Sequence, residues 1–407
     1  MHVLDELHAR GMIAQVTHEE ELRQRMEEGP VTFYCGFDPT ADSMTAGHLV
    51  PILAMAYLQR AGHRPIALFG GGTGMVGDPS GKTELRGMLT LDGIARNIDG
   101  MSTQMSRLLH FADGKVLAVD NGDWLRKLNY VDFIREIGVH FSVNRMLAAD
   151  CYKARLETGL TFFEMNYMVM QSYDFLQLNR TQNCTLQVGG DDQWSNILAG
   201  RDLIRSVDGK EAFAMTYPLL LTADGRKMGK SERGAVWLDA ARTSVYDFYQ
   251  YWRNIGDAEV LPTMKRLTFL PLEEIRAFEA LSGSELNPVK ERLAFELTSF
   301  VHGEDRALAA REAARAVFGG AGESEDMPTT ELAAAELAGG LPAPDLLLRT
   351  KLVLSKSEGR RLITQGGLTV NGVKMTDITA AVTEDDFAGG ALILCKGKKQ
   401  YHRVVLK

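Results

Sequence analysis

Short apolar runs alternate with helix-like segments through the first half of this chain of 407 residues. Four of these runs have the length of strands: Val31–Phe37, Pro65–Phe69, Lys115–Val119 and Thr185–Val188. Strands that alternate with helices form a parallel sheet, and ligands bind such a sheet beyond the carboxyl ends of its strands. The alternation therefore predicts an α/β fold with a Rossmann-like parallel sheet.

Two changes of composition divide the rest of the chain. From Ala240 to Phe318 the apolar pattern becomes helical, and from Ala307 to Pro344 the chain is rich in Ala, Gly and Glu, a mixture typical of a tether. A chain of this length should hold two or three domains. We therefore predict a sheet domain at 1–238, a helical domain at 239–318, a linker at 319–344 and a small terminal domain at 345–407.

Charge is unevenly distributed along the chain. The net charge is −8, yet residues 345–407 hold 11 Lys and Arg against 6 Asp and Glu, a net charge of +5. A basic terminal domain on an acidic body favours a surface that binds phosphate groups, as in a nucleic acid. A solvated charged surface without a partner has the same composition, so charge alone leaves both interpretations open.

Composition also narrows the class of protein. The four cysteines are scattered, without the spacing of a disulfide framework or a zinc site, and we interpret them as reduced thiols. The chain has no run of 18 apolar residues, and Met1–Glu6 lacks the basic and then apolar layout of a signal peptide. These features predict a soluble cytoplasmic protein.

Two short motifs make most sense as one site. Thr45–His48 (Thr-Ala-Gly-His) opens a helix predicted from about His48 to Arg60, and Lys227–Ser231 (Lys-Met-Gly-Lys-Ser) places two lysines around a glycine. Gly47 leaves room for a flat base, while His48 and the free N–H groups of the helix can face phosphate oxygens. Two lysines on a mobile loop suit a departing pyrophosphate. Together the motifs predict a nucleoside triphosphate site.

A glycine-rich stretch follows the second strand and partly matches two other motifs, the dinucleotide-binding motif and the P-loop. Gly72, Gly74 and Gly77 satisfy G-x-G-x-x-G, but Pro79 and Gly81 would interrupt the helix that a dinucleotide site needs. The tripeptide Gly81-Lys82-Thr83 resembles the end of a P-loop whose first glycine is missing. The stretch can instead position three polar residues, or it is a tight connection without function. The three residues are Asp78, Lys82 and Arg86.

Further polar residues gather on one helix and at one strand end. Tyr167, Gln171 and Asp174 are spaced i, i+4 and i+7 on a helix predicted at Thr161–Leu178, so they share a face. The spacing suits a pocket for a small polar ligand, although a solvated stripe is the commoner cause. The strand Thr185–Val188 leads into Gly189–Asn196, whose acidic and amide side chains can bind ribose or a carboxylate.

Taken together, these motifs resemble those of the bacterial tyrosyl-tRNA synthetases of class I. The resemblance runs from about Tyr34 to the C-terminus, and its last part, with Ser355–Ile363 and Gly367–Gly372, is similar to an S4 RNA-binding domain. It rests on the following stretches: Tyr34–Ser43, Gly77–Gly81, Tyr167 with Gln171 and Asp174, Gly189–Trp194, and Lys227–Ser231. The implied fold is a Rossmann-like catalytic domain, a helical domain and a small α+β S4-like domain.

The resemblance implies a role for each motif residue. Tyrosine would be bound by Tyr34, Asp78, Tyr167, Gln171, Asp174 and Gln193, with Tyr34 and Asp174 at its phenolic hydroxyl. ATP would be bound by Cys35, Gly36, Asp38, Gly47, His48, Gly190, Asp192 and Lys230. The catalytic set would comprise Thr40, Thr45, His48, Lys82, Arg86, Lys227, Lys230 and Ser231.

The implied reaction is activation of L-tyrosine by ATP to tyrosyl-adenylate, followed by transfer of tyrosine to the 3′ end of its tRNA. It needs no protein nucleophile, because the tyrosine carboxylate attacks the α-phosphorus and the protein aligns the reactants. Mg²⁺ would arrive with ATP, with no separate metal site in the protein. The resemblance also implies a homodimer.

One position departs from the resemblance, and two other functions stay open. Many members of the family have His where this chain has Thr45; because a hydroxyl can still donate to a phosphate oxygen, we expect altered ATP affinity or rate, without loss of chemistry. A non-charging RNA-binding paralogue would keep the terminal domain but lose pocket residues. A nucleotidyltransferase for a small cofactor would keep Thr-x-Gly-His but would not need an S4-like domain.

Overall fold

The computed structural model describes residues 1–80, 89–109, 117–221, 225, 228–231, 234–318, 328–337, 339–387, 390–397 and 400–407. These residues form two compact units. The first comprises Met1–Arg242 with Ile255–Val289, and the second comprises Thr243–Asn254 with Lys290–Lys407. Among the described residues, no helix combines the length and the apolar character needed to cross a membrane.

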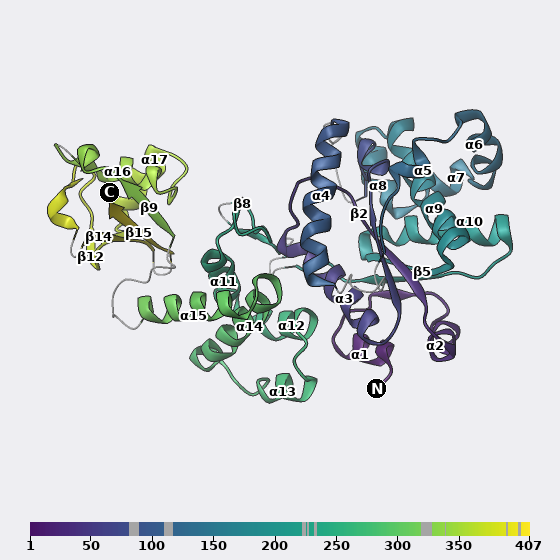
Figure 1. Cartoon of the computed structure of the whole chain (residues 1–407), viewed down its shortest axis with the longest axis horizontal. Helices are drawn as coiled ribbons and strands as arrows, with labels where there is room; N and C mark the ends of the chain where they lie inside the picture. The colour runs from purple at the N-terminus through teal and green to yellow at the C-terminus, as the bar shows by residue number, and fades with distance from the viewer. Residues whose placement is uncertain are drawn as a thin grey trace. The chain divides into compact units, whose positions relative to one another are not determined.

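A six-stranded sheet forms the centre of the first unit (Figure 1). Its spatial order is β1 (Gln15–Val16), β6 (Phe213–Tyr217), β5 (Cys184–Gly190), β2 (Thr32–Phe37), β3 (Arg64–Phe69) and β4 (Leu117–Asp120). Strands β2 to β6 run parallel, and only the short β1 pairs antiparallel, with β6. The predicted α/β class is confirmed, because each of the four predicted runs overlaps a parallel strand; residues 115 and 116 of the third run lie outside the described residues.

Helices connect and cover these strands. The chain crosses from β2 to β3 through α3 and from β5 to β6 through α10, so it leaves the neighbouring strands β2 and β5 in opposite directions along the sheet. The helices of this unit are α1 (Val3–Ala9), α2 (Glu19–Glu28), α3 (Leu49–Arg60), α4 (Leu91–Leu108), α5 (Gly122–Leu125), α6 (Tyr130–Glu136), α7 (Val143–Leu147), α8 (Asp150–Thr158), α9 (Phe162–Gln182), α10 (Trp194–Asp208), α12 (Asp257–Leu267) and α13 (Leu272–Ala277).

Helix α9 is held in place at its start and along its length. Thr161 accepts a hydrogen bond from the Glu164 N–H, and the Glu164 carboxylate bonds both the backbone and the hydroxyl of Thr161, which completes a capping box. The buried Arg155 pairs with Glu164 at 2.9 Å. Further along, Gly200 lets α10 approach closely, since a Cβ there would lie 3.2 Å from the Phe175 ring. The polar face of α9 is therefore fixed against the sheet.

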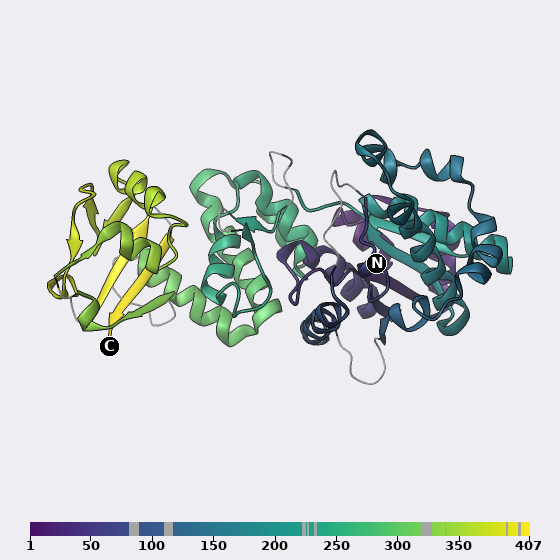
Figure 2. The same cartoon turned by 90° about the horizontal axis from the view of Figure 1, so that it is seen from above.

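The second unit contains helices and a separate five-stranded sheet (Figure 2). Its helices are α11 (Val245–Arg253), most of α14 (Leu286–His302), α15 (Glu304–Phe318), α16 (Ala343–Arg349) and α17 (Lys356–Thr364). The sheet has the order β12 (Val373–Met375), β11 (Leu368–Val370), β14 (Ala391–Lys396), β15 (Gln400–Leu406) and β9 (Thr329–Leu332). A second pairing joins β10 (Leu341–Pro342) to β13 (Ala381–Val382).

The structure corrects the linker predicted at 319–344. Residues 319–327 lie outside the described part, but β9 pairs with β15 in parallel, and β10 and the start of α16 also fall within the predicted range. Leu332 and Leu337 are buried in the core of the terminal domain. The small residues around these two leucines have the composition of a tether, so the sequence did not indicate that the leucines belong to a core. The predicted helical region is also divided, since α12 and α13 belong to the first unit.

Candidate active site

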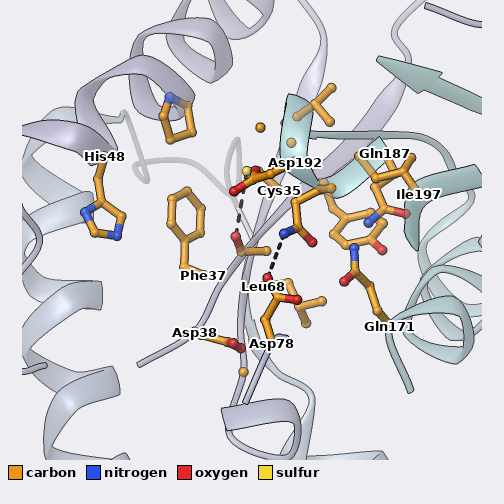
Figure 3. Close-up of a pocket in the computed structure, with 18 of the residues that line it drawn as sticks. Cys35, Phe37, Asp38, His48, Leu68, Asp78, Gln171, Gln187, Asp192 and Ile197 are labelled. Atoms are coloured by element: carbon orange, nitrogen blue, oxygen red, sulfur yellow. Dashed lines mark hydrogen bonds between the residues drawn. The ribbon is translucent and has the colours of Figure 1, made fainter. Parts of the chain in front are cut away.

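A pocket of about 420 Å³ opens at the carboxyl ends of β2, β3, β5 and β6 (Figure 3). In the close-up, His48 lies on one side of the pocket and Gln171 with Gln187 on the other, with Asp78 between them. The following predicted site residues line it: Tyr34, Cys35, Gly36, Asp38, Thr40, Gly47, His48, Asp78, Tyr167, Gln171, Asp174, Gly190, Asp192 and Gln193. Residues as far apart in the chain as Tyr34 and Gln193 thus meet in one cavity.

One end of the pocket is a buried polar group around Tyr34 and Asp174. The Tyr34 hydroxyl is buried and has no hydrogen-bond partner among the described residues. Asp174 accepts hydrogen bonds from Asn121 Nδ2 at 2.8 Å and from Trp124 Nε1 at 2.7 Å. Burial raises the pKa of Asp174 to about 8 and the pKa of Tyr34 well above its usual value. A ligand group that both donates and accepts, such as a hydroxyl, would satisfy this end.

Asn121 and Trp124 are site residues that the sequence analysis missed. Asn121 follows β4 directly, and its side chain also accepts from the Gly72 N–H at 2.7 Å and donates to Thr73 Oγ1 at 3.0 Å. It therefore ties the glycine-rich turn after β3 to Asp174. Its place at the carboxyl end of a parallel strand was a usable signal. We find no sequence signal for Trp124.

Hydrogen-bond acceptors cluster in the middle of the pocket. Asp38 accepts from the Tyr167 hydroxyl at 3.1 Å and from Thr73 Oγ1 at 3.0 Å. Asp78 accepts from Gln193 Nε2 at 2.7 Å and from the Ser80 N–H at 2.9 Å.

Gln171 adds a further acceptor, because its buried Oε1 has no partner among the described residues. An ammonium ion donates hydrogen bonds and accepts none. The two carboxylates, the Tyr167 oxygen and the Gln171 amide oxygen are therefore suitable neighbours for it.

The other end of the pocket is formed by the turn that opens α3. The Thr45 N–H donates to His48 Nδ1 at 3.0 Å, so in the neutral ring the proton lies on Nε2. Burial lowers the pKa of His48, which favours this neutral form. His48 can then donate from Nε2 to a ligand.

Thr45 contacts the ring of His48 in this arrangement. Its hydroxyl lies 3.0 Å from His48 Nδ1, and Thr45 is not one of the residues that line the pocket. The side chain that was expected to contact phosphate therefore holds the histidine ring in the ligand-free protein, because Thr45 is the cap of the short 3₁₀ turn Ala46–His48.

Cys35 has an unexpected partner. Its Sγ lies 3.0 Å from the hydroxyl of Tyr217, which is buried at the end of β6. The phenol reaches across β5, the strand that separates β6 from β2. Burial raises the pKa of the Cys35 thiol to about 12, so it remains protonated. Tyr217 also lines the pocket, and its place at the end of a strand is a signal that the sequence analysis left unused.

The two motifs first linked by the sequence analysis pack backbone against backbone. A Cβ at Gly229, whose φ is +89°, would lie 2.9 Å from the Gly47 nitrogen. The Val236 N–H donates to the Gly229 carbonyl, and the Ala46 N–H donates to the Val236 carbonyl. Residues 228–231 and the turn before α3 are thus parts of one structure, as the motifs suggested.

The cationic residues of the prediction are only partly visible. Lys230 and Ser231 form strand β7, which pairs with β8 (Gly234–Ala235), but their side chains lie outside the described part. Lys82, Arg86 and Lys227 lie entirely outside the described residues.

Comparison with protein families matches nearly the whole chain. Residues 26–319 match the model for class I tRNA synthetases (W and Y), and residues 321–404 match the model for the tyrosine–tRNA ligase SYY-like C-terminal domain.

Individual relatives give the same result. A tyrosine–tRNA ligase of Acetivibrio thermocellus is 56% identical over 404 residues, covering 99% of both chains, and one of Clostridium beijerinckii is 55% identical over 405 residues, covering 100% of this chain and 99% of the relative. A C-terminally truncated mitochondrial tyrosyl-tRNA synthetase of Aspergillus nidulans superposes with a TM-score of 0.69 at 28% identity, covering 78% of this chain and 94% of that one.

The raised pKa of Asp174 predicts a pH-dependent stability. A carboxyl whose folded-state pKa is raised contributes stability that is fully present below its unfolded value and is lost as pH rises through about 8. Thermal unfolding of the ligand-free protein and of Asp174→Asn should therefore show a difference that moves in favour of the variant between pH 5 and pH 8 and then levels off.

The matched control is Asp208→Asn, because a hydrogen bond from Arg180 lowers the pKa of Asp208. Its difference from the unmodified protein should stay flat over the same pH range. A flat difference for Asp174→Asn as well would contradict the raised pKa.

Proposed function

Since the chain belongs to the class I tRNA synthetases and within them to the tyrosine–tRNA ligases, we propose a role for each part of the pocket in the two steps of that reaction. In the first step tyrosine and ATP form tyrosyl-adenylate and pyrophosphate, and in the second the tyrosyl group passes to tRNA. The observation that carries the proposal is the buried Tyr34 hydroxyl, which lacks a partner among the described residues and lies in the same polar group as Asp174.

Tyr34 and Asp174 select the phenol of the substrate. The substrate hydroxyl accepts from Tyr34, whose raised pKa keeps its own proton in place, and shares a second hydrogen bond with the Asp174 carboxyl. Asn121 and Trp124 occupy one site on each Asp174 oxygen and so orient the carboxylate. Phenylalanine would leave these buried groups unpaired, which costs more than the loss of a contact at a surface.

The acceptor cluster in the middle of the pocket orients the reacting end of tyrosine. Asp78, Tyr167 and Gln171 hold the ammonium group, and the Gln193 amide, itself held by Asp78, faces the carboxylate. This arrangement directs a carboxylate oxygen toward the α-phosphorus of ATP, and alignment of the two reactants supplies most of the catalysis in such a step.

ATP occupies the end of the pocket near α3. Gly36 and Gly47 leave space for the nucleoside, and the neutral His48 donates to it from Nε2. Asp38 and Asp192 accept hydrogen bonds from the ribose hydroxyls. Cys35 and the backbone at Gly190 line the same part of the pocket. Thr40 faces the phosphates from the pocket wall. Thr45 acts through the ring of His48.

Positive charge stabilises the departing pyrophosphate. The cationic side chains of Lys82, Arg86, Lys227 and Lys230 and the hydroxyl of Ser231 are suited to bind the charge that develops on its oxygens. Mg²⁺ would come with ATP. Bound to the phosphate oxygens, the ion would offset their charge during attack.

A tyrosine-dependent ATP–pyrophosphate exchange assay tests this assignment. Tyr34→Phe removes one neutral hydrogen bond of about 1 kcal/mol, so kcat/KM for tyrosine should fall roughly fivefold, and the preference for tyrosine over phenylalanine should narrow. Tyr249→Phe is the matched control, because Tyr249 is equally buried, in the second unit, and its hydroxyl also lacks a partner among the described residues.

Removal of Mg²⁺ by a chelator should abolish exchange. Absence of tyrosine-dependent exchange in the unmodified protein would refute the assignment, and faster exchange with another amino acid would refute the specificity.

The terminal domain is proposed to bind tRNA as an S4-like domain. Helix α17 presents exposed Lys356, Arg360 and Arg361, and the domain carries the net positive charge found in the sequence. Such cations bind phosphates and release counterions, which makes binding sensitive to salt. The tRNA step therefore depends on this domain, whereas formation of the adenylate does not.

Charge reversal separates the two steps. Arg360→Glu combined with Arg361→Glu should raise KM for tRNA in aminoacylation by at least tenfold at low salt, since two phosphate contacts become repulsive, and should leave exchange unchanged. The control, Arg205→Glu with Lys210→Glu on exposed positions near the end of α10, changes the net charge equally. An equal effect of both pairs would show that only net charge matters.

We further propose that two copies of the chain associate through the segment from α6 to the start of α9. Eight large apolar side chains there are exposed: Tyr130, Val131, Ile134, Val139, Val143, Leu156, Phe162 and Phe163. Exposed apolar side chains gathered in this way are typical of an association surface.

A single substitution tests the dimer. Phe162 is 62% exposed and lies in the first turn of α9, where an aspartate is compatible with the helix. Phe162→Asp should give the monomer mass in light scattering at micromolar concentration, whereas Val373→Asp at a 71% exposed position of the second unit should keep the dimer mass. A monomer mass for the unmodified protein would contradict the proposal.

The substrates also suggest where the protein works. Free tRNA and ATP are present in the cytoplasm, so we place its activity there. Recovery of the native protein from a membrane or extracellular fraction would contradict this.

A further inference from the structure

The loop that joins β2 to α3, residues 38–45, lies against helix α4, which supplies none of the residues that line the pocket. Asn97 Nδ2 donates to the Pro39 carbonyl at 2.8 Å. Gln104 binds the loop twice, accepting from the Met44 N–H at 2.9 Å and donating to Ser43 Oγ at 2.9 Å. Both ends of the loop are therefore hydrogen-bonded to α4.

The contacts come from one face of the helix. Asn97, Gly100 and Gln104 are spaced i, i+3 and i+7, which places them on one side. A Cβ at Gly100 would lie 2.1 Å from the Asp42 carbonyl oxygen, so the helix backbone and the loop backbone touch directly. Only glycine fits that position.

The helix itself is firmly packed. Its apolar positions Ile94, Met101, Met105 and Leu108 are buried, and it packs beside α3 (Figure 1). Thr90 caps its first turn by accepting from the Gly93 N–H. A rigid helix can therefore hold an irregular loop in one conformation.

The loop that α4 holds is part of the nucleotide end of the pocket. Asp38 and Thr40 line the pocket, and the residue after Met44 is Thr45, which fixes the ring of His48. The tyrosine end is built from other elements: Tyr34 on β2, Asp174 on α9 and Asn121 after β4.

We propose that Asn97, Gly100 and Gln104 are positioning residues that set the affinity of the pocket for ATP by fixing the 38–45 loop, an inference that rests on the proposed nucleotide end. None of the three lines the pocket. A small displacement of the loop moves Thr40 and His48 together, and misplacement of binding groups by about 1 Å is enough to change rates strongly.

Two substitutions of Gln104 test the proposal. Gln104→Met removes both polar contacts at nearly constant volume, and KM for ATP in the exchange assay should rise roughly tenfold, while KM for tyrosine changes less than about twofold. Gln104→Glu should be tolerated, because a carboxylate can accept from the Met44 N–H and from the Ser43 hydroxyl.

At Asn97 the replacement of the amide by a carboxylate should have the opposite effect. Asn97→Asp loses the donor to the Pro39 carbonyl and places a negative charge against that oxygen, so KM for ATP should rise although the same replacement of amide by carboxylate is tolerated at Gln104. Ser106→Ala, at an exposed position on α4 whose hydroxyl donates within the helix to Thr103, is the control and should leave both KM values unchanged.

The outcomes separate this inference from the proposed function. The inference is overturned if Gln104→Met and Asn97→Asp change the two KM values equally. It is also overturned if they lower the melting temperature and leave KM for ATP unchanged, because the contacts are then only structural. If the unmodified protein shows no tyrosine-dependent exchange, the proposed function fails. Equilibrium dialysis with ATP alone then decides the inference, which requires weaker ATP binding by Gln104→Met and Asn97→Asp than by Gln104→Glu.

Discussion

The pocket depends on the divergence of the chain between two neighbouring parallel strands, β2 and β5. Beyond β2 the chain crosses to β3, and beyond β5 it crosses to β6 on the other side, so a gap opens at their carboxyl ends. Successive residues of a strand face opposite sides of the sheet. Tyr34 therefore reaches the side of α9, while Cys35 shares the other face with Tyr217, and one strand supplies both ends of the pocket.

Several polar groups that line this gap are buried. The Tyr34 hydroxyl and Gln171 Oε1 have no partners among the described residues, and burial raises the pKa of the Asp174 carboxyl. Each of these states is unfavourable until a ligand supplies the missing hydrogen bond. At the other end, burial lowers the pKa of His48, and the hydrogen bond from the Thr45 N–H to Nδ1 places the proton of the neutral ring on Nε2. The fold thus holds unfavourable polar groups in positions that a matching substrate relieves.

The sequence predicted the fold class and most residues of the pocket wall, because the motifs end strands or open helices and a parallel sheet brings such positions together. It did not show which side chains these residues contact. Asn121, Trp124 and Tyr217 act through contacts with residues more than 45 positions away, and these contacts depend on strand order. The contact between the Thr45 hydroxyl and His48, three residues away, was not predicted either. The residues predicted as a linker include strands and core leucines. The leucines are isolated in an Ala- and Gly-rich stretch and show no hydrophobic periodicity that would indicate a strand or a helix.

A crystal structure with bound L-tyrosine would show whether the two ends of the pocket bind the two ends of the substrate. We expect the phenolic oxygen within about 3 Å of both Tyr34 Oη and an Asp174 oxygen, with the ammonium group beside Asp78 and Gln171. A ligand bound in the reverse direction, with its ammonium group at Asp174, or a phenol that contacts neither residue, would contradict it.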